Sequence, residues 1–186
     1  MKIIVITSGS GHSSAYRLMA DSTMLANDKP FFVPDFAPEF KLRPALAVRI
    51  DRLGKSIAPR FAHRYYQCAA ACAVVTPTGV EGCSLDARFT AFDGALMMGK
   101  TIPLAELPAA DGLTVTTTLS EQPAVSTPAV TIEQIDAIIA EASEYFTLKM
   151  GDLIVIESGA ESQTLHIGER LSGSLCEKPS LTMRIK

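Results

Sequence analysis

Long hydrophobic runs are missing from this sequence of 186 residues. No apolar stretch approaches the roughly 18 residues that a membrane-spanning helix needs, so we expect no membrane partner. The N-terminal apolar run, residues 3–6, follows a single lysine and is too short for the apolar segment of a signal peptide. We therefore expect a cytoplasmic protein in which residues 2–7 form the first strand.

A concentrated excess of positive charge is also missing. Lysine and arginine together number 17 against 20 aspartates and glutamates, which gives a formal net charge of −3. Binding to the phosphate backbone of nucleic acid needs a concentrated basic surface, so the composition predicts no nucleic acid partner. The hydrophobic share of 47% is ordinary for a globular protein, and the length predicts a single domain over residues 1–186 with a sizeable core.

The glycine pattern of a dinucleotide-binding loop is incomplete. Gly9 and Gly11 follow the first expected strand, but the third glycine position carries Ser14. No acidic residue ends a second strand about 20 residues later, where such a site holds its ribose. We therefore favour a Gly/Ser turn, followed by a polar loop or a helical turn near residues 12–25, over the alternative of a nucleotide-binding loop.

A second cysteine pair, which a thiolate zinc site needs, is absent. The four cysteines are Cys68, Cys72, Cys83 and Cys176. The first two are four residues apart, and we expect them on one face of a helix. Without a secretion signal we expect reduced thiols. Because free cysteine packs as a small hydrophobic side chain, we predict buried structural thiols and not metal ligands.

The clearest pattern that is present is the alternation over residues 41–51. The apolar side chains on one face are Leu42, Leu46, Val48 and Ile50. The opposite face carries Lys41, Arg43 and Arg49 beside alanines, and this period of two predicts a strand with one apolar face and one cationic face. Pro44 cannot donate a backbone hydrogen bond, which predicts that it lies near the strand start or at a sheet edge. We expect the rest of the chain to form a β-rich body around this strand.

Other segments carry helix or strand patterns. The clearest helix is predicted over residues 131–146, with Thr131 as its N-cap and an apolar stripe at helical spacing. Pro59 and an alanine-rich run predict a second helix over residues 58–72. Further strands or extended pieces are expected at residues 73–76, 101–104, 113–119, 153–156, 171–176 and 181–185.

Five segments, taken in chain order, resemble motifs of the fumarylacetoacetate hydrolase family. They are PFFVP at residues 30–34, ALAVRI at 45–50, FDG at 92–94, EYFTLKMGDLI at 144–154 and LHIGERL at 165–171. The resemblance implies a mixed α/β, mostly β fold, a fumarylacetoacetate-hydrolase-like β roll with a few helices, and a homodimer. It also implies enzymes that bind Mg²⁺ or Mn²⁺ through three or four carboxylates. These enzymes catalyse hydrolysis, decarboxylation, hydration or isomerisation of 2-oxo or β-diketo acids.

The metal-ligand positions implied by the resemblance carry other residues. The paired glutamates of the family's strand fall at Arg43 and Ala45, and its next aspartate falls at Val74. Two lysine positions of the family carry Val33 and Thr90. Hard divalent cations are held by oxygen ligands, and an arginine repels them. We therefore predict no metal cofactor, although the family precedent is Mg²⁺ or Mn²⁺, and the catalytic residues are unknown.

An arginine in place of a metal ligand suggests a different kind of site. A guanidinium is a fixed cation that can hold a carboxylate through two parallel hydrogen bonds. Our hypothesis is a metal-free pocket for a small organic acid, with Arg43, Arg49, Thr76 and Ser158 as the substrate-binding candidates. The alternative is that the arginines are solvated charges on a half-exposed strand and that no pocket survives.

Three functions stay open at this point. The first is a divergent family homologue without metal-dependent catalysis, a possible pseudoenzyme that binds a small organic acid. The second is an active Mg²⁺-dependent hydrolase, decarboxylase or isomerase of 2-oxo or acylpyruvate acids, which requires other carboxylates such as Asp35, Glu39, Asp51 or Glu81 to converge. The third is a non-enzymatic structural or partner-binding protein that uses the β roll as a docking surface.

Overall fold

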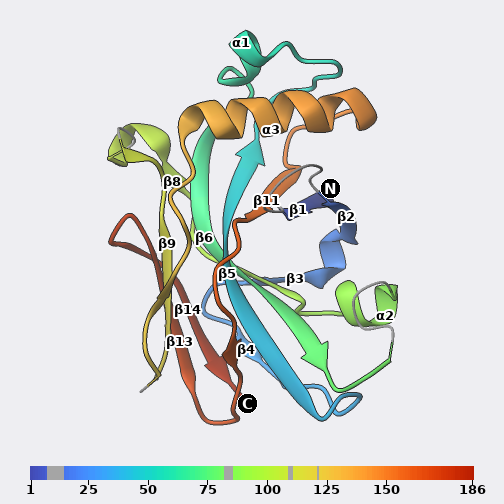
Figure 1. The fold of residues 1–186 in the computed structure, drawn as a ribbon, viewed down its shortest axis with the longest axis vertical. Helices are drawn as coiled ribbons and strands as arrows, with labels where there is room; N and C mark the ends of the chain where they lie inside the picture. Colours follow the sequence, from blue (N-terminus) through green and yellow to red (C-terminus); the bar gives the residue numbers. More distant parts are fainter. Residues whose placement is uncertain (8–14, 82–85, 109–110, 121) are drawn as a thin grey trace.

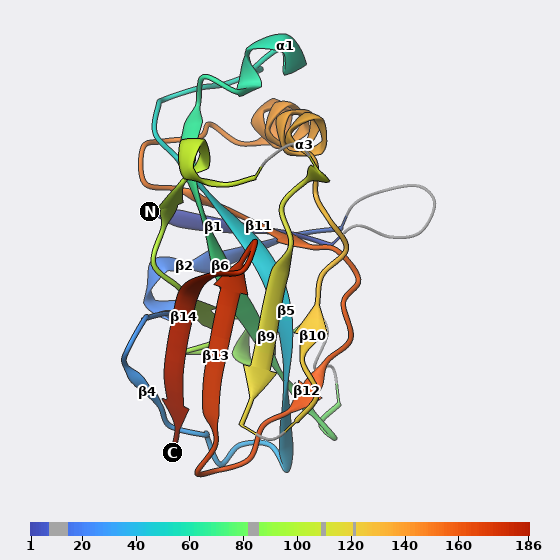
Figure 2. The same ribbon diagram turned by 90° about the vertical axis from the view of Figure 1, so that its left-hand side faces the viewer.

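The computed structural model describes residues 1–7, 15–81, 86–108, 111–120 and 122–186. Its fold is mixed α/β and mostly β, with a large curled sheet packed beside a smaller one (Figure 1, Figure 2). This architecture confirms the β-rich fold that the resemblance implies. None of the described helices is long and apolar enough to cross a membrane.

The larger sheet has nine strands among the described residues. Its long antiparallel central pair is β5 (Glu39–Ile50) and β6 (Tyr66–Thr78). β11 (Leu153–Glu157) pairs with β5 on its other side, and β1 (Lys2–Thr7) runs parallel to β11. The first strand of the chain, β1, thereby lies beside β11, which belongs to the C-terminal part of the sequence. The other strands of this sheet are β2 (Ala15–Ala20), β3 (Met24–Ala26), β7 (Leu96–Met98), β8 (Ile102–Pro103) and β12 (Gln163–Thr164).

The smaller sheet packs against the apolar face of the larger one (Figure 2). Five strands form it within the described residues, in the order β10, β9, β13, β14 and β4. They are β10 (Val125–Ser126), β9 (Val115–Leu119), β13 (Arg170–Leu175), β14 (Lys178–Ile185) and β4 (Pro30–Phe31). The C-terminal strands expected at residues 171–176 and 181–185 correspond to β13 and β14.

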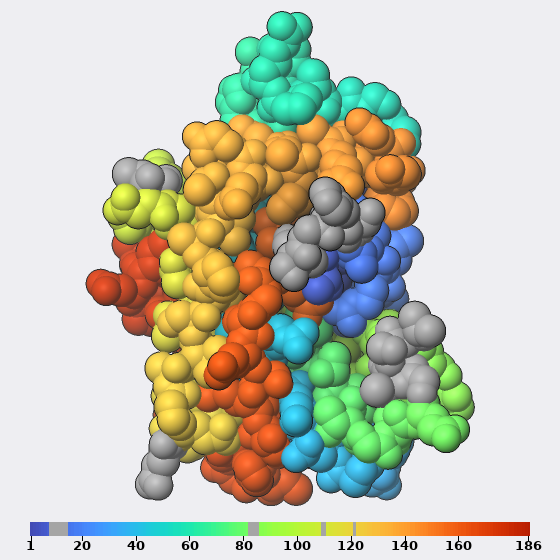
Figure 3. Space-filling model, in the orientation of Figure 1, coloured from blue at the N-terminus to red at the C-terminus, as the bar shows by residue number. Residues whose placement is uncertain are grey.

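Helices lie outside the two sheets. α3 (Ile132–Tyr145) crosses one end of the molecule, and α1 (Pro59–Ala62) lies beyond α3 on its outer side (Figure 1, Figure 3). α2 (Ala87–Thr90) lies beside the far end of β6 (Figure 1). Two short 3₁₀ helices lie between strands that are successive in the chain: η1 (Asp21–Thr23) between β2 and β3, and η2 (Leu104–Glu106) between β8 and β9.

Thr131 caps α3 as predicted. The Thr131 side chain accepts a hydrogen bond from the backbone of Gln134, and the Gln134 side chain accepts one from the backbone of Thr131. This reciprocal capping box satisfies two amide groups that would otherwise lack partners at the helix start. Ile135 and Ile139 are fully buried one turn apart, so the helix covers the end of the core between the two sheets.

The alternation of β5 sorts its side chains onto the two faces of the large sheet. Its even-numbered apolar residues belong to the larger apolar cluster, whereas Ala45 and Ala47 face a smaller cluster on the opposite side. The expectation that Pro44 marks a strand start or an edge is wrong, because Pro44 lies in the middle of a central strand. It falls between the stretch of β5 that pairs with β12 and the stretch that pairs with β11, so its missing amide hydrogen costs neither pairing.

The predicted helix over residues 58–72 is also wrong in most of its length. Only α1 is helical there, and the alanine-rich run belongs to β6. Ala70 pairs with Ala47 and Ala71 with Leu46, and all four are fully buried. Tertiary packing between two faces of apolar residues has overridden the helix propensity of alanine. Residues 15–20, expected in a loop or helical turn, form β2 along the edge of β1.

The strand conformation of β6 determines where two of the cysteines lie. Cys68 and Cys72 lie on one face of β6, and not of a helix. Cys72 is completely buried, and Cys68 and Cys176 are partly buried; all three are free thiols. Cys83 lies outside the described residues. The expectation of buried thiols therefore holds in full for Cys72.

Candidate functional site

Glu157 is a buried carboxylate at the end of β11. Only 4% of its side chain is exposed. Its Oε2 accepts hydrogen bonds from Thr7 Oγ1 at 2.7 Å and from Arg17 Nη2 at 2.9 Å. Its Oε1 lies 3.9 Å from Arg43 Nη1, which is an ion-pair distance but too long for a hydrogen bond. One carboxylate is thus held between two guanidinium groups.

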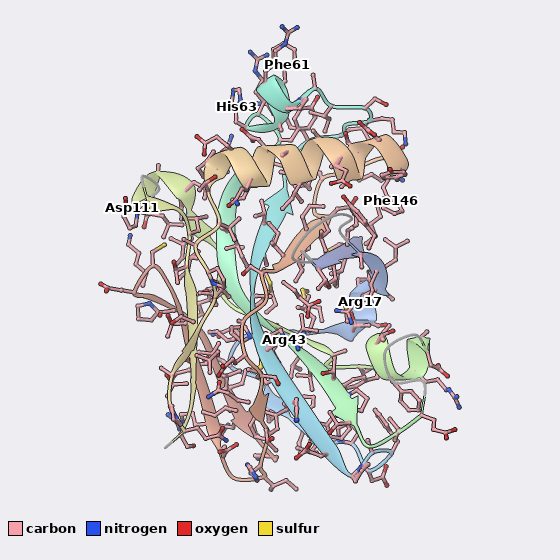
Figure 4. The ribbon with its side chains drawn as sticks, viewed as in Figure 1. Arg17, Arg43, Phe61, His63, Asp111 and Phe146 are labelled. Carbon is pink, nitrogen blue, oxygen red and sulfur yellow. The ribbon has the colours of Figure 1, made fainter. Side chains whose placement is uncertain are left out.

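Strand register explains why these side chains meet. Thr7 pairs directly with Glu157 in the parallel β1–β11 ladder, so both side chains point to the same face of the sheet. On β2, Arg17 pairs with Val5, which lies two residues before Thr7 and therefore points the same way. Arg43 reaches Glu157 from β5 on the other side of β11. Figure 4 labels Arg17 and Arg43, which lie toward the inner side of the curled sheet.

Next to this cluster, the middle of β5 and β6 presents small and apolar residues on the same face. Ala45 and Ala47 on β5 lie next to Cys72 and Val74 on β6, and all four are at most 1% exposed. Burial, and then the nearby charge of Glu157, raises the pKa of the Cys72 thiol far above its ordinary value. The Cys72 thiol instead donates a hydrogen bond to the Ala45 carbonyl at 3.1 Å, so it is a neutral packing group and not a nucleophile.

The two arginines are not equivalent. Arg17 has 24% of its side chain exposed and makes a direct charged hydrogen bond to Glu157. Arg43 has 42% exposed and makes only the longer contact. Within the described part of the chain, Nε of both arginines is buried without a hydrogen-bond partner. Arg17 therefore neutralises Glu157, while Arg43 keeps an uncommitted positive charge that faces solvent on one side.

The sequence-predicted site residues separate into two groups. Thr76 on β6 pairs with Lys41 on β5, and Val74, two residues earlier on β6, pairs with Arg43. Thr76 therefore lies diagonally beside Arg43 on the same face. Arg49 lies on that face as well, but six residues along β5 is about 20 Å at the rise of a strand. Its guanidinium is 3.9 Å from Asp51. The structure therefore brings Arg43 and Thr76 together, and leaves Arg49 out of the cluster.

Ser158 lies in a different environment from the arginines. It lines a cavity of about 380 Å³ together with Gln134 and Ile138 of α3 and with Ile156. Ile156 belongs to the apolar cluster on the α3 side of the sheet, opposite to the face that carries Glu157. The Ser158 hydroxyl is buried without a partner among the described residues.

Sequence reasoning missed the centre of this cluster. The sequence pattern does not single out Glu157, and it places Arg17 in a polar loop or helical turn near residues 12–25. The available signal was the continuation of the alternation in β11, which places Glu157 on the same face as Leu153 and Val155. A carboxylate in that row must find a cation or lose most of its charge.

The comparisons with known proteins decide the family. The family model described as fumarylacetoacetate (FAA) hydrolase C-terminal matches residues 13–183. The chain belongs to the fumarylacetoacetate hydrolase family. No curated protein sequence matches it.

Several solved structures share the fumarylacetoacetate hydrolase fold with this chain. A 2-hydroxyhepta-2,4-diene-1,7-dioate isomerase from Mycobacterium marinum is 18% identical, with a TM-score of 0.84 over 99% of this chain and 73% of that one. A fumarylpyruvate hydrolase from Pseudomonas aeruginosa, solved with Mn²⁺ and pyruvate, is 14% identical, with a TM-score of 0.81 over 100% and 89%. A 5-carboxymethyl-2-hydroxymuconate delta-isomerase from Mycobacterium smegmatis is 16% identical, with a TM-score of 0.82 over 99% and 78%.

The divalent metal that the family resemblance implies does not fit the residues present. Arg43 and Val74, at two of the implied ligand positions, are directly opposite each other in the β5–β6 ladder. The first is a cation, and the second and Ala45 are buried apolar side chains. Over the described ranges, no group of three His, Cys, Asp or Glu side chains could hold a metal ion. Of the oxygen donors that a hard cation needs at these three positions, one is replaced by a guanidinium and two by apolar side chains.

Proposed function

We propose that this member of the fumarylacetoacetate hydrolase family is a metal-independent binder of a small organic acid, and not a metal-dependent enzyme. The observation that carries the proposal is the uncommitted charge of Arg43, which stands where the resemblance places a metal ligand. A half-exposed guanidinium with free donors can hold a carboxylate through two parallel hydrogen bonds. Thr76, diagonally beside Arg43, supplies a hydroxyl to the same ligand.

Two observations support an organic acid as the ligand. Nε of Arg17 and Nε of Arg43 are buried donors without partners in the described part of the chain, and a buried donor is stabilised by an acceptor oxygen. The related fumarylpyruvate hydrolase was solved with pyruvate, a small 2-oxo acid. A carboxylate ligand with a neighbouring carbonyl supplies both charge and acceptor atoms.

Calorimetric titration of pyruvate and acetate tests the proposal. We expect saturable binding with a stoichiometry of one per chain, unchanged by Mg²⁺, Mn²⁺ or a chelator. Arg43→Gln removes a charged hydrogen-bonding partner and is expected to weaken binding roughly ten- to hundredfold. Arg184→Gln is the matched control, since Arg184 is an exposed arginine on β14 of the other sheet. Binding that requires Mg²⁺, or equal loss in both variants, would overturn the proposal.

The homodimer stays a separate prediction from the family resemblance. We expect a mass of two chains by size-exclusion chromatography with light scattering, at all concentrations used for the titration. A monomer would remove this prediction without affecting the binding site, because every residue of the Glu157 cluster comes from one chain.

A further inference from the structure

Glu157 places a fixed negative charge inside the proposed organic acid site. Its Oε2 accepts two hydrogen bonds, from Thr7 and from Arg17, and its side chain is almost fully buried. It stands at the end of a strand that is paired with β1 up to Glu157 itself. The carboxylate is therefore anchored on rigid strands and belongs to the site in every state in which the sheet is formed.

The formal charge of the cluster follows from its members. Arg17 and Arg43 contribute two positive charges and Glu157 one negative charge, which leaves one positive charge. Lys41, two residues before Arg43 on the same face of β5, is 3.9 Å from Glu39 and is therefore already balanced. A ligand with one negative charge brings this group of side chains to neutrality.

We propose that Glu157 is the residue that determines specificity at this site, and that it selects monocarboxylates over dicarboxylates. This inference rests on the proposed function. A second carboxylate on the ligand would leave a net negative charge in a partly buried site, where an uncompensated charge is costly. Oε1 of Glu157 faces Arg43 at 3.9 Å, so it also repels any second carboxylate drawn toward the same guanidinium.

The wild-type protein tests the inference without any substitution. Acetate and malonate are compared by calorimetric titration at a mildly alkaline pH, where malonate carries two charges. We expect acetate to bind more tightly than malonate, with the gap shrinking at high salt because screening weakens the repulsion. A wild-type protein that prefers malonate overturns the inference and leaves the organic acid site standing. A protein that binds neither anion overturns the proposed function itself.

Two variants separate charge from shape. Glu157→Gln keeps the size of the side chain and raises the cluster to two positive charges, so the preference should move toward malonate by roughly tenfold or more. The double variant Arg17→Gln with Glu157→Gln returns the cluster to one positive charge, and its preference should return toward that of the wild type. Glu161→Gln, which removes an exposed carboxylate after β11, is the control.

Each outcome has a defined meaning. The charge argument is contradicted if the ratio of the acetate and malonate dissociation constants is the same in Glu157→Gln, Glu161→Gln and the wild type. A double variant that keeps the malonate preference of Glu157→Gln also contradicts it, because the effect would then come from the amide and not from the charge. Circular dichroism and cooperative urea unfolding show whether each variant is folded before its titration is used.

Discussion

Replacing Arg17 with methionine should destabilise the fold more than the same change at Arg43. Arg17→Met leaves the carboxylate of Glu157, with only 4% of its side chain exposed, without its hydrogen-bonded cation. Breaking a buried pair in this way costs about 3–5 kcal/mol. Arg17 is itself 24% exposed, and Arg43 remains 3.9 Å from the carboxylate. The expected loss in free energy of unfolding is therefore nearer 2–3 kcal/mol.

Arg43→Met should cost about 1 kcal/mol or less, because the Arg43 side chain is 42% exposed and makes no hydrogen bond to Glu157. The assay is urea unfolding at neutral pH, followed by circular dichroism, with equal slopes of free energy against urea as the condition for comparing the variants. Adding Glu157→Gln to Arg17→Met should recover part of the loss, because no buried charge then lacks a partner. An Arg43→Met loss as large as that of Arg17→Met would refute the assignment of unequal roles.

Three further changes test the fold around the site. Thr131→Ala should remove the capping box of α3 and lower the free energy of unfolding by about 1 kcal/mol, measured by urea unfolding. Gly99→Ala would place a Cβ 2.5 Å from the Ala71 carbonyl oxygen, and its cost should reach about 1–3 kcal/mol in the same assay. Burial alone would raise the pKa of Asp152, but hydrogen bonds from Lys2 outweigh it and lower the pKa below its ordinary value. Its contribution to stability is therefore present above the ordinary carboxyl pKa and lost as pH falls through the folded pKa, so Asp152→Asn should unfold with a weaker acid dependence in melting experiments.

The fold was predictable where local pattern and packing agree. The alternation of β5, the capping box of α3 and the order of the motifs all pointed to structures that are present. The alanine-rich part of β6 was not predictable from propensity, because its strand state depends on two buried faces supplied by distant segments. The position of Pro44 was wrongly predicted for a related reason. A central strand accepts a proline there only because Pro44 faces the gap between β11 and β12, two strands that are far away in sequence.

Two residues of the candidate site, Arg43 and Thr76, could be named from the sequence, but its central residues Glu157 and Arg17 could not. Arg43 could be singled out because the resemblance places a metal ligand there, and its alternation on β5 fixed its face. Glu157 and Arg17 could not, because their meeting requires β1 to run parallel to β11 across most of the chain and β2 to fold back beside β1. The alternation of β11 marks only the face on which Glu157 lies, and the long-range strand order that brings Arg17 to it leaves no local mark.

If the metal site was lost through its ligands alone, restoring them should restore metal binding. Arg43 and Val74 are directly opposite across β5 and β6, and Ala45 is two residues from Arg43 on the same face. Cβ atoms of directly opposite residues lie about 4.5–5.5 Å apart, which lets longer side chains converge on one ion. The triple variant Arg43→Glu, Ala45→Glu and Val74→Asp therefore places three carboxylates around one point.

Without metal, these closely spaced carboxylates, two of them at buried positions, repel one another and Glu157, so the triple variant should melt below the wild type. Mn²⁺ at a hundredfold excess over its dissociation constant should then add about 2.7 kcal/mol to the free energy of unfolding. The wild type and the single variant Arg43→Glu should show no such gain, because neither has three carboxylates at the site. If the triple variant is folded and its melting temperature does not change when Mn²⁺ is added, these positions do not form a metal site in this chain. Arg43 would then not stand in place of a ligand, and the proposed binding of an organic acid at Arg43 would lose its structural basis.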